Sequence, residues 1–188
     1  FFLFLQSAAG DISTRFTRPS QSYEAMQEMG DRLFEKAEEM LSEKTDTYSL
    51  KEISSESMSL PIEHVFEPID ISSLPEGLTD REKETIRIGA VVREQLAEKL
   101  DTLSKEITLE AVHLSGLNLV YCPNELFSQY TEALSSKTSL LVCYSNGYGG
   151  YVTPPGFTAL TYERFTDTFS DETKRTILEC IQKLSEEC

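Results

Sequence analysis

The chain has 188 residues, of which 39% are hydrophobic and 26% charged, so its composition is that of a globular protein rather than a disordered or collagen-like one. This length predicts a single domain over residues 1–188, with a core large enough to need neither a metal nor a disulfide. The formal net charge of −15 repels phosphate backbones, so nucleic acid is not an expected partner.

The cysteines and the start of the chain bear on its location and its boundaries. Cys122, Cys143, Cys180 and Cys188 form no C-x-x-C pair, which argues against a zinc knuckle or a disulfide framework and favours a reducing, cytoplasmic location. Residues 1–5 are apolar but have no basic segment before them, and they are far fewer than the ~20 residues of a membrane span.

Residues 1–5 are instead typical of a buried strand. A chain that starts inside a strand without methionine is interpreted as the excised downstream part of a longer protein. Such a part would leave an apolar surface uncovered where its upstream half docked, so we expect it to self-associate.

The first half of the chain predicts two helices around an irregular strand. Helical spacing of apolar residues predicts an amphipathic helix over residues 23–41, and core packing of its stripe is favoured over a methionine-lined binding groove. The stripe consists of Met26, Met29, Leu33, Ala37 and Met40. Residues 47–60 alternate only weakly, which predicts a partly exposed strand or hairpin.

The next helix begins at a capping box formed by Thr79 and Glu82 and is expected to continue to about residue 103. Its predicted buried face is apolar and consists of Ile88, Val92, Leu96 and Leu100.

The second half predicts a hairpin, a short helix, a buried strand and a final helix. The hairpin joins strands over residues 107–114 and 117–121, and the short helix follows at about residues 125–134. Residues 140–144 are a continuous apolar run, and Ser170 caps a helix that continues to about residue 186. The sequence therefore predicts an α/β or α+β fold in which helices cover a mixed sheet.

Two loops after predicted strands are the places where chemistry is expected, because side chains there are held by rigid elements at the edge of a sheet. The first loop supplies Glu125, and the second supplies Asn146, Tyr148 and Tyr151 among three glycines. Each has a plain structural alternative: an acidic residue at a helix start interacts with the helix dipole, and glycine-tyrosine turns are common.

The two histidines have no metal-ligand spacing. Neither an HxH nor an HExxH pattern surrounds His64 or His113. His113 is expected to be a satisfied residue on a strand face, and His64 an exposed residue in a proline-rich loop.

Short pieces of the chain, taken in order, resemble the neutral/alkaline ceramidases and their smaller bacterial relatives. The pieces are Phe4-Leu5-Gln6 before Gly10-Asp11-Ile12-Ser13, then Pro123-Asn124-Glu125, then Asn146-Gly147-Tyr148-Gly149-Gly150-Tyr151-Val152-Thr153, and finally Tyr162-Glu163. The resemblance implies that the chain is the C-terminal portion of a larger ceramidase-like catalytic domain.

In that family, zinc is held by two histidines of the upstream half and by a glutamate and a tyrosine of the downstream half, and the metal activates water that cleaves an amide. Carried over by motif, the metal ligands here would be Glu125 and Tyr151. The neighbouring residues of the same pieces are candidates for a supporting shell or a substrate loop: Asp11, Ser13, Asn146 and Tyr148. The sequence departs from the family's pattern at Asn124, where the family has glycine, and at Thr14, where many members have proline.

The resemblance further implies a small-molecule or lipid amide as substrate, such as an N-acyl sphingoid lipid, and the upstream half of the same protein as a partner. Without the upstream histidines this chain alone is expected to be inactive and to bind zinc poorly, because two oxygen ligands make a weak zinc site. The competing hypothesis is a non-catalytic binding or scaffold protein that keeps the fold without the metal.

Overall fold

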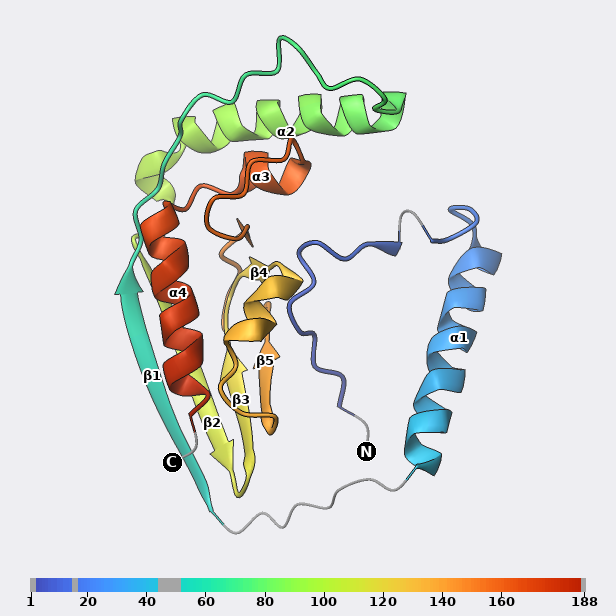
Figure 1. The fold of residues 1–188 in the computed structure, drawn as a ribbon, viewed down its shortest axis with the longest axis vertical. Helices are drawn as coiled ribbons and strands as arrows, with labels where there is room; N and C mark the ends of the chain where they lie inside the picture. The colour runs from blue at the N-terminus through green and yellow to red at the C-terminus, as the bar shows by residue number, and fades with distance from the viewer. Residues whose placement is uncertain (1–2, 15–16, 44–51, 187–188) are drawn as a thin grey trace.

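The computed structural model describes residues 3–14, 17–43 and 52–186. Within them, a four-stranded sheet has the order β1-β2-β3-β5, built from β1 (Ile53–Pro61), β2 (Glu106–Leu114), β3 (Leu117–Tyr121) and β5 (Ser139–Val142). The first three strands are antiparallel, whereas β3 and β5 are parallel. The expected mixed sheet with helices around it is therefore present (Figure 1).

Local sequence signals account for the central hairpin. Strands β2 and β3 are joined by Ser115 and Gly116, whose φ angles of 36° and 102° are both positive, as a two-residue turn of the primed type requires. Strand β2 alternates buried and partly buried residues, and its buried Leu109 and Ala111 are fully covered. The predicted hairpin is confirmed.

The final helix supplies the cover for the sheet. Helix α4 (Asp171–Leu184) begins at Ser170, whose hydroxyl accepts a hydrogen bond from the amide of Thr173, as predicted. Its apolar residues Ile177, Ile181 and Leu184 are fully buried against the sheet. In Figure 1, α4 lies across β1 and β2.

A second layer forms at one end of the sheet. Helix α2 (Asp80–Glu98) begins at the predicted capping box and packs on the short helix α3 (Tyr162–Thr166), which the sequence did not predict (Figure 1). The buried face of α2 differs from the expected one: Ile86 and Gly89 are buried, whereas Ile88 is 49% exposed. A Cβ at Gly89 would lie 3.0 Å from Cβ of Phe165, so the missing side chain brings the two helices together.

Arg93 of α2 holds this layer through the backbone. Its guanidinium donates hydrogen bonds of 3.0–3.3 Å to the carbonyl oxygens of Val65, Glu67, Phe165 and Asp167. Five bonds from one planar group fix the connection after β1 and the end of α3 relative to α2.

A buried ion pair joins α4 to the segment that follows α3. Lys174 Nζ lies 2.8 Å from Asp167 Oδ2, and the two side chains are 9% and 2% exposed. The same carboxylate oxygen accepts bonds from the amide and hydroxyl of Thr153, and Lys174 donates to that hydroxyl. Both charges are therefore paired and hydrogen-bonded, which a buried charge requires.

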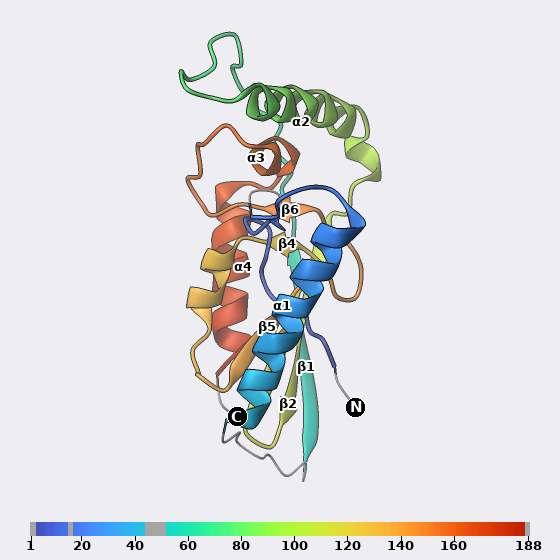
Figure 2. The same cartoon turned by 90° about the vertical axis from the view of Figure 1, so that its right-hand side faces the viewer.

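The helix at the start of the chain confirms one expectation and corrects another. Helix α1 (Tyr23–Ser42) forms almost as predicted, but its apolar stripe is not in the core: Met26 is 60% exposed and Leu33 is 64% exposed. Ala25 is the one buried residue among those described in the helix. Figures 1 and 2 show α1 standing beside the sheet rather than on it, so no described element covers the stripe.

The expected first strand is likewise not formed in its described part. Leu3 and Phe4 are 81% and 75% exposed and belong to no strand, whereas Phe1 and Phe2 lie outside the described residues. The physical reason is the absence of a neighbour, since the segment's contact with the sheet begins only at Gln6, whose carbonyl accepts a bond from the amide of Cys143. The strand expected over 47–60 begins at Ile53, and residues 44–51 are not described.

The buried ion pair gives a stability prediction. Lys174→Met leaves Asp167 as an uncompensated buried carboxylate, so we expect it to lower the free energy of unfolding in urea by about 3–5 kcal/mol. The matched control is Arg175→Met on the same helix, because Arg175 makes an exposed ion pair with Asp171 at 3.8 Å. Its effect should stay below about 1 kcal/mol, and equal effects of the two substitutions would contradict the assigned role of Lys174.

Candidate functional site

Two very short strands bring the two predicted loops together. Strand β4 (Glu125–Leu126) pairs in parallel with β6 (Tyr151–Val152), and in this register Glu125 is opposite Tyr151. Leu126 and Val152 are fully buried. Because successive side chains of a strand point to opposite faces, Glu125 and Tyr151 share the face that is not buried.

The expected helix start at Glu125 is therefore wrong. The chain instead forms β4 and then a 3₁₀ helix, Ser128–Ala133. Backbone pairing decides the conformation, because the amide of Glu125 donates to the carbonyl of Gly150 at 2.9 Å. The helix-dipole explanation for this acidic residue consequently does not apply.

Asn124 fastens the second loop to β4. Its side chain is fully buried, and Nδ2 donates to the carbonyl oxygen of Gly150 at 3.2 Å. A Cβ at Gly149 would collide with the Asn124 amide group, so the loop can approach only because this residue is glycine. Asn124 thus has a visible structural role.

Tyrosine hydroxyls converge on the Glu125 carboxylate. Tyr148 donates to Oε1 at 2.5 Å, and Tyr144 donates to Oε2 at 3.3 Å. The Tyr151 hydroxyl also hydrogen-bonds to Glu125. One carboxylate thus accepts bonds from three phenols that come from β6 and the loop before it.

These phenols are held in the neutral form. Burial, followed by the charge of Glu125 and the hydrogen bond to it, raises the pKa of Tyr144 to about 12. Burial, then the hydrogen bond to Glu125, raises the pKa of Tyr148 and of Tyr151 well above the ordinary tyrosine value. At neutral pH all three groups are therefore hydrogen-bond donors to the carboxylate.

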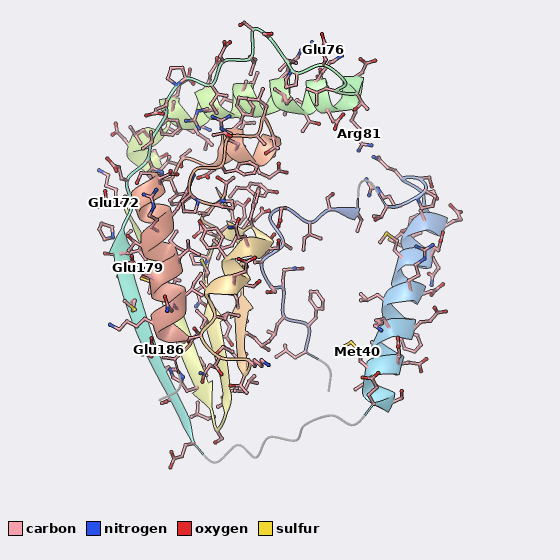
Figure 3. The ribbon with its side chains drawn as sticks, viewed as in Figure 1. Met40, Glu76, Arg81, Glu172, Glu179 and Glu186 are labelled. Carbon is pink, nitrogen blue, oxygen red and sulfur yellow. The ribbon has the colours of Figure 1, made fainter. Side chains whose placement is uncertain are left out.

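The Glu125 side chain lines a cavity of about 870 Å³. The N-terminal loop, the start of α2 and the segment around α3 line it. Its charged lining is mostly acidic, namely Asp11, Glu82, Glu125 and Glu163, with Arg81 as the basic residue. Arg81 is labelled in Figure 3 at the start of α2. An acidic cavity of this kind attracts cations.

The four other predicted site residues lie in different surroundings, and not all of them are near Glu125. Tyr148 contacts Glu125, and Ser13 lines the cavity. Asp11 accepts bonds from the amide and hydroxyl of Ser128, so it caps the 3₁₀ helix. Asn146 adopts a positive φ of 61° and donates to Glu110 at 2.6 Å, on the side of a second cavity.

The N-terminal loop reaches the site because of Gly10. Its amide donates to the carbonyl of Leu126 at 2.8 Å, and a Cβ at this position would lie 2.8 Å from the carbonyl oxygen of Glu125. Only glycine allows so close an approach. The Gly10-Asp11 piece and the Glu125 piece, distant in sequence, are therefore neighbours in the fold.

The described residues supply only part of the donor set that zinc needs. Among the described residues no group of three or more histidine, cysteine, aspartate or glutamate side chains could hold a metal. Both imidazoles are engaged elsewhere: His113 contacts Asn118 and Glu56, and His64 contacts Thr168 and the Ser104 carbonyl. His64 is thus half-buried rather than exposed as expected. By themselves these residues fit zinc only as part of a larger ligand set.

Two solved structures match the chain over 97% of its length. They are a ceramidase complexed with C2, with a TM-score of 0.65 and 16% identity, and the neutral ceramidase from Pseudomonas aeruginosa, with a TM-score of 0.59 and 17% identity. The chain shares the fold of these ceramidases. It spans 38% and 36% of their respective lengths.

The resemblance in fold is not accompanied by a match in sequence. No protein-family model matches this chain, and no curated protein sequence does. Within the described ranges, no helix has the length and apolar character needed to cross a membrane.

Tyr144 is the site residue that the sequence did not single out. It was expected to be the last residue of a buried strand, but its φ of 57° turns the backbone after β5 and directs its hydroxyl to Glu125. Tyr162 belongs to the last of the resembling pieces, and its ring packs edge-on against that of Tyr151, with 6.1 Å between the ring centroids. Neither contact has a local sequence signal, because each depends on a residue distant along the chain.

The tyrosine cluster gives a pH prediction. Because the pKa of Tyr144 is higher in the folded chain than in the unfolded chain, its contribution to stability is full below pH 10 and is lost as the pH rises to about 12. Glu125→Gln removes the negative charge that helps to raise the pKa of Tyr144. This pKa should therefore fall, while burial keeps it above 10. An NMR titration with ¹³Cζ-tyrosine measures this, and an unchanged pKa would contradict the contact.

Gly149 gives a second prediction for the site. Gly149→Ala forces the loop away from Asn124, so we expect the free energy of unfolding to fall by about 1–3 kcal/mol. The control is Gly30→Ala in α1, where an added Cβ meets nothing within 4 Å. That substitution should raise helix stability by about 0.5–1 kcal/mol, and a Gly149→Ala protein as stable as the unsubstituted chain would contradict the packing argument.

Proposed function

We propose that this chain is the C-terminal part of a zinc-dependent amide hydrolase resembling neutral ceramidase. Glu125 and Tyr151 are proposed to furnish two zinc ligands, and residues outside this sequence the others. The proposed substrate is an N-acyl amide such as an N-acyl sphingoid lipid. The chain alone is proposed to be inactive, and the intact protein to be cytoplasmic.

The observation that supports this proposal most is the pairing of Glu125 with Tyr151 in the β4–β6 register. The sequence predicts these two loops as separate places for chemistry, and in the fold they provide a carboxylate and a phenol on one face. They do so within a ceramidase-like fold and beside an acidic cavity. A cation that needs oxygen ligands is the species that this arrangement favours.

The residues of the chain have separable roles under this proposal. Tyr144 and Tyr148 fix the orientation of the Glu125 carboxylate, since each donates to a different oxygen. The Tyr151 phenol, neutral in the chain by itself, would need a cation next to it to lose its proton. Zinc, when bound, would polarise the amide and lower the pKa of bound water.

A non-catalytic binding or scaffold protein is the second candidate. It is favoured by the Glu125 carboxylate, which in this chain is already saturated with phenol donors. Such a protein would keep the ceramidase-like fold without the metal. The sequence upstream of this chain in the intact protein separates the candidates: two histidines at strand ends, one of them in an HxH-like pattern, support the enzyme.

The ligand assignment is tested in the intact protein with Tyr151→Phe. Because only the hydroxyl is lost, the fold should be retained while zinc affinity falls by more than about 100-fold and amidase activity is abolished. Tyr148→Phe is the matched control, and as a supporting residue it should cost about tenfold in zinc affinity. Zinc content is measured by atomic absorption and turnover with a short-chain N-acyl sphingosine. Normal zinc content and turnover in Tyr151→Phe would disprove the assignment.

A further inference from the structure

The loop over residues 144–150 has an unusual backbone conformation. The φ angles of Tyr144 (57°), Asn146 (61°), Gly147 (139°) and Gly150 (78°) are all positive. A positive φ is strained for a residue other than glycine, so this conformation persists only where the surroundings hold it. The contacts of the loop therefore decide where its side chains lie.

The two ends of the loop are fixed by backbone hydrogen bonds. At its start the amide of Ser145 donates to the carbonyl of Cys122 at 3.1 Å, and near its end the amide of Gly149 donates to the carbonyl of Pro123 at 3.0 Å. Among the described residues, the middle of the loop, 146–148, is held instead by two hydrogen bonds of its side chains. These two bonds carry the orientation of the middle of the loop.

The two side-chain bonds end on carboxylates of different sheets. Asn146 Nδ2 donates to Oε2 of Glu110 at 2.6 Å, and Glu110 lies in β2 opposite Tyr121 of β3. The Tyr148 hydroxyl donates to Oε1 of Glu125 in β4. The loop thus connects the four-stranded sheet to the two-stranded sheet through one amide and one phenol.

Strand β2 is a firm base for this connection. It pairs with β1 along all nine of its residues. The chain neighbours of Glu110, Leu109 and Ala111, are fully buried. Because successive side chains of a strand point to opposite faces, Glu110 lies on the face away from them and can reach the loop. The main sheet, rather than the loop, therefore sets the position of this carboxylate.

Asparagine suits position 146 for two reasons. It is one of the few residues other than glycine that adopt a positive φ readily. Its amide also supplies the N–H donor that the Glu110 carboxylate needs, because an ionised carboxylate only accepts hydrogen bonds. Asn146 therefore links the position of Glu110 to the backbone conformation two residues before Tyr148.

We propose that Glu110 is a positioning residue of the candidate site and that, through Asn146, it holds Tyr148 against the Glu125 carboxylate. This role deepens the proposed function and rests on it only where zinc is concerned. A proposed zinc ligand is then oriented by contacts that begin on β2 and pass from carboxylate to amide to phenol. Outer contacts of this kind orient the ligands of metal sites.

The ¹³Cζ NMR signal of Tyr148 in the chain tests this role without zinc. The signal is assigned with Tyr148→Phe. Glu110→Ala should move it towards the signal of an exposed tyrosine such as Tyr23, because the phenol is no longer held against its carboxylate partner. Glu110→Gln should leave it in place, because the new amide oxygen still accepts the bond from Asn146. An unchanged signal in Glu110→Ala would overturn the proposal.

Glu106→Ala is the matched control for the lost charge. Glu106 is exposed and lies four residues before Glu110 on the same face of β2. Its substitution should leave the Tyr148 signal in place. A shift as large as that in Glu110→Ala would mean that loss of charge, rather than loss of the bond to Asn146, moves the signal, and it would count against the proposal.

Exchange of donor and acceptor gives a second test in the chain. In Asn146→Asp two carboxylates face each other, so the Tyr148 signal should move as it does in Glu110→Ala. Aspartate tolerates a positive φ as asparagine does, so the backbone requirement is still met. Adding Glu110→Gln should return the signal, because the amide then donates from β2 and the loop accepts. A double variant without recovery would contradict the proposed route.

Zinc affinity of the intact protein separates this role from the proposed function. Glu110→Ala should lower the affinity about tenfold, as Tyr148→Phe does, and should add no further loss in a Tyr148→Phe background. A further loss in that background would mean that Glu110 acts by another route and would overturn the proposal. If the unsubstituted intact protein binds no zinc, the proposed function fails, whereas the ¹³Cζ measurements still decide the role of Glu110.

Discussion

The buried contact between Asp167, Lys174 and Thr153 holds the parts of the molecule on which the candidate site depends. Thr153 directly follows β6, Asp167 directly follows α3, and Lys174 lies in α4. A carboxylate and an ammonium removed from water are tolerated only when each is paired and hydrogen-bonded. The end of β6 is therefore fixed to the helix that covers the main sheet, and β6 in turn fixes β4.

The geometry of the site is a consequence of this attachment. Strands of two residues have little stability of their own, so β4 and β6 persist because Leu126 and Val152 are buried and Asn124 bridges the loops. Their exposed faces then present Glu125 and Tyr151 side by side. Tyr144 and Tyr148 complete the surroundings of the carboxylate from the same loop, so one rigid attachment orders three phenols.

Two regions of the molecule are organised by opposite principles. Around Glu125, a small acidic site is saturated with hydrogen bonds and is enclosed by buried supports. Along α1, large apolar side chains such as Met26 and Leu33 lie exposed. The first region is suited to a small cation or polar ligand, whereas the second has no cover among the described residues.

Sequence by itself determined the features that depend on residues close along the chain. The capping box of Thr79 and Glu82, the cap at Ser170 and the turn at Ser115 and Gly116 were all predictable, because their hydrogen bonds or φ requirements lie within four residues. The mixed sheet followed from the strand patterns. The two loops of the candidate site followed from their positions at strand ends and from the ceramidase-like motifs.

Tertiary structure decided everything that depends on a distant partner. The apolar periodicity of α1 specified a helix but not whether a neighbour covers its stripe, and the apolar Leu3 and Phe4 likewise have no cover in the described fold. The strand conformation of Glu125 comes from its backbone bond to Gly150, and the contact of Tyr144 comes from a positive φ after β5. Periodicity and caps are local properties of a chain, whereas burial and convergence are properties of surfaces that meet only after folding.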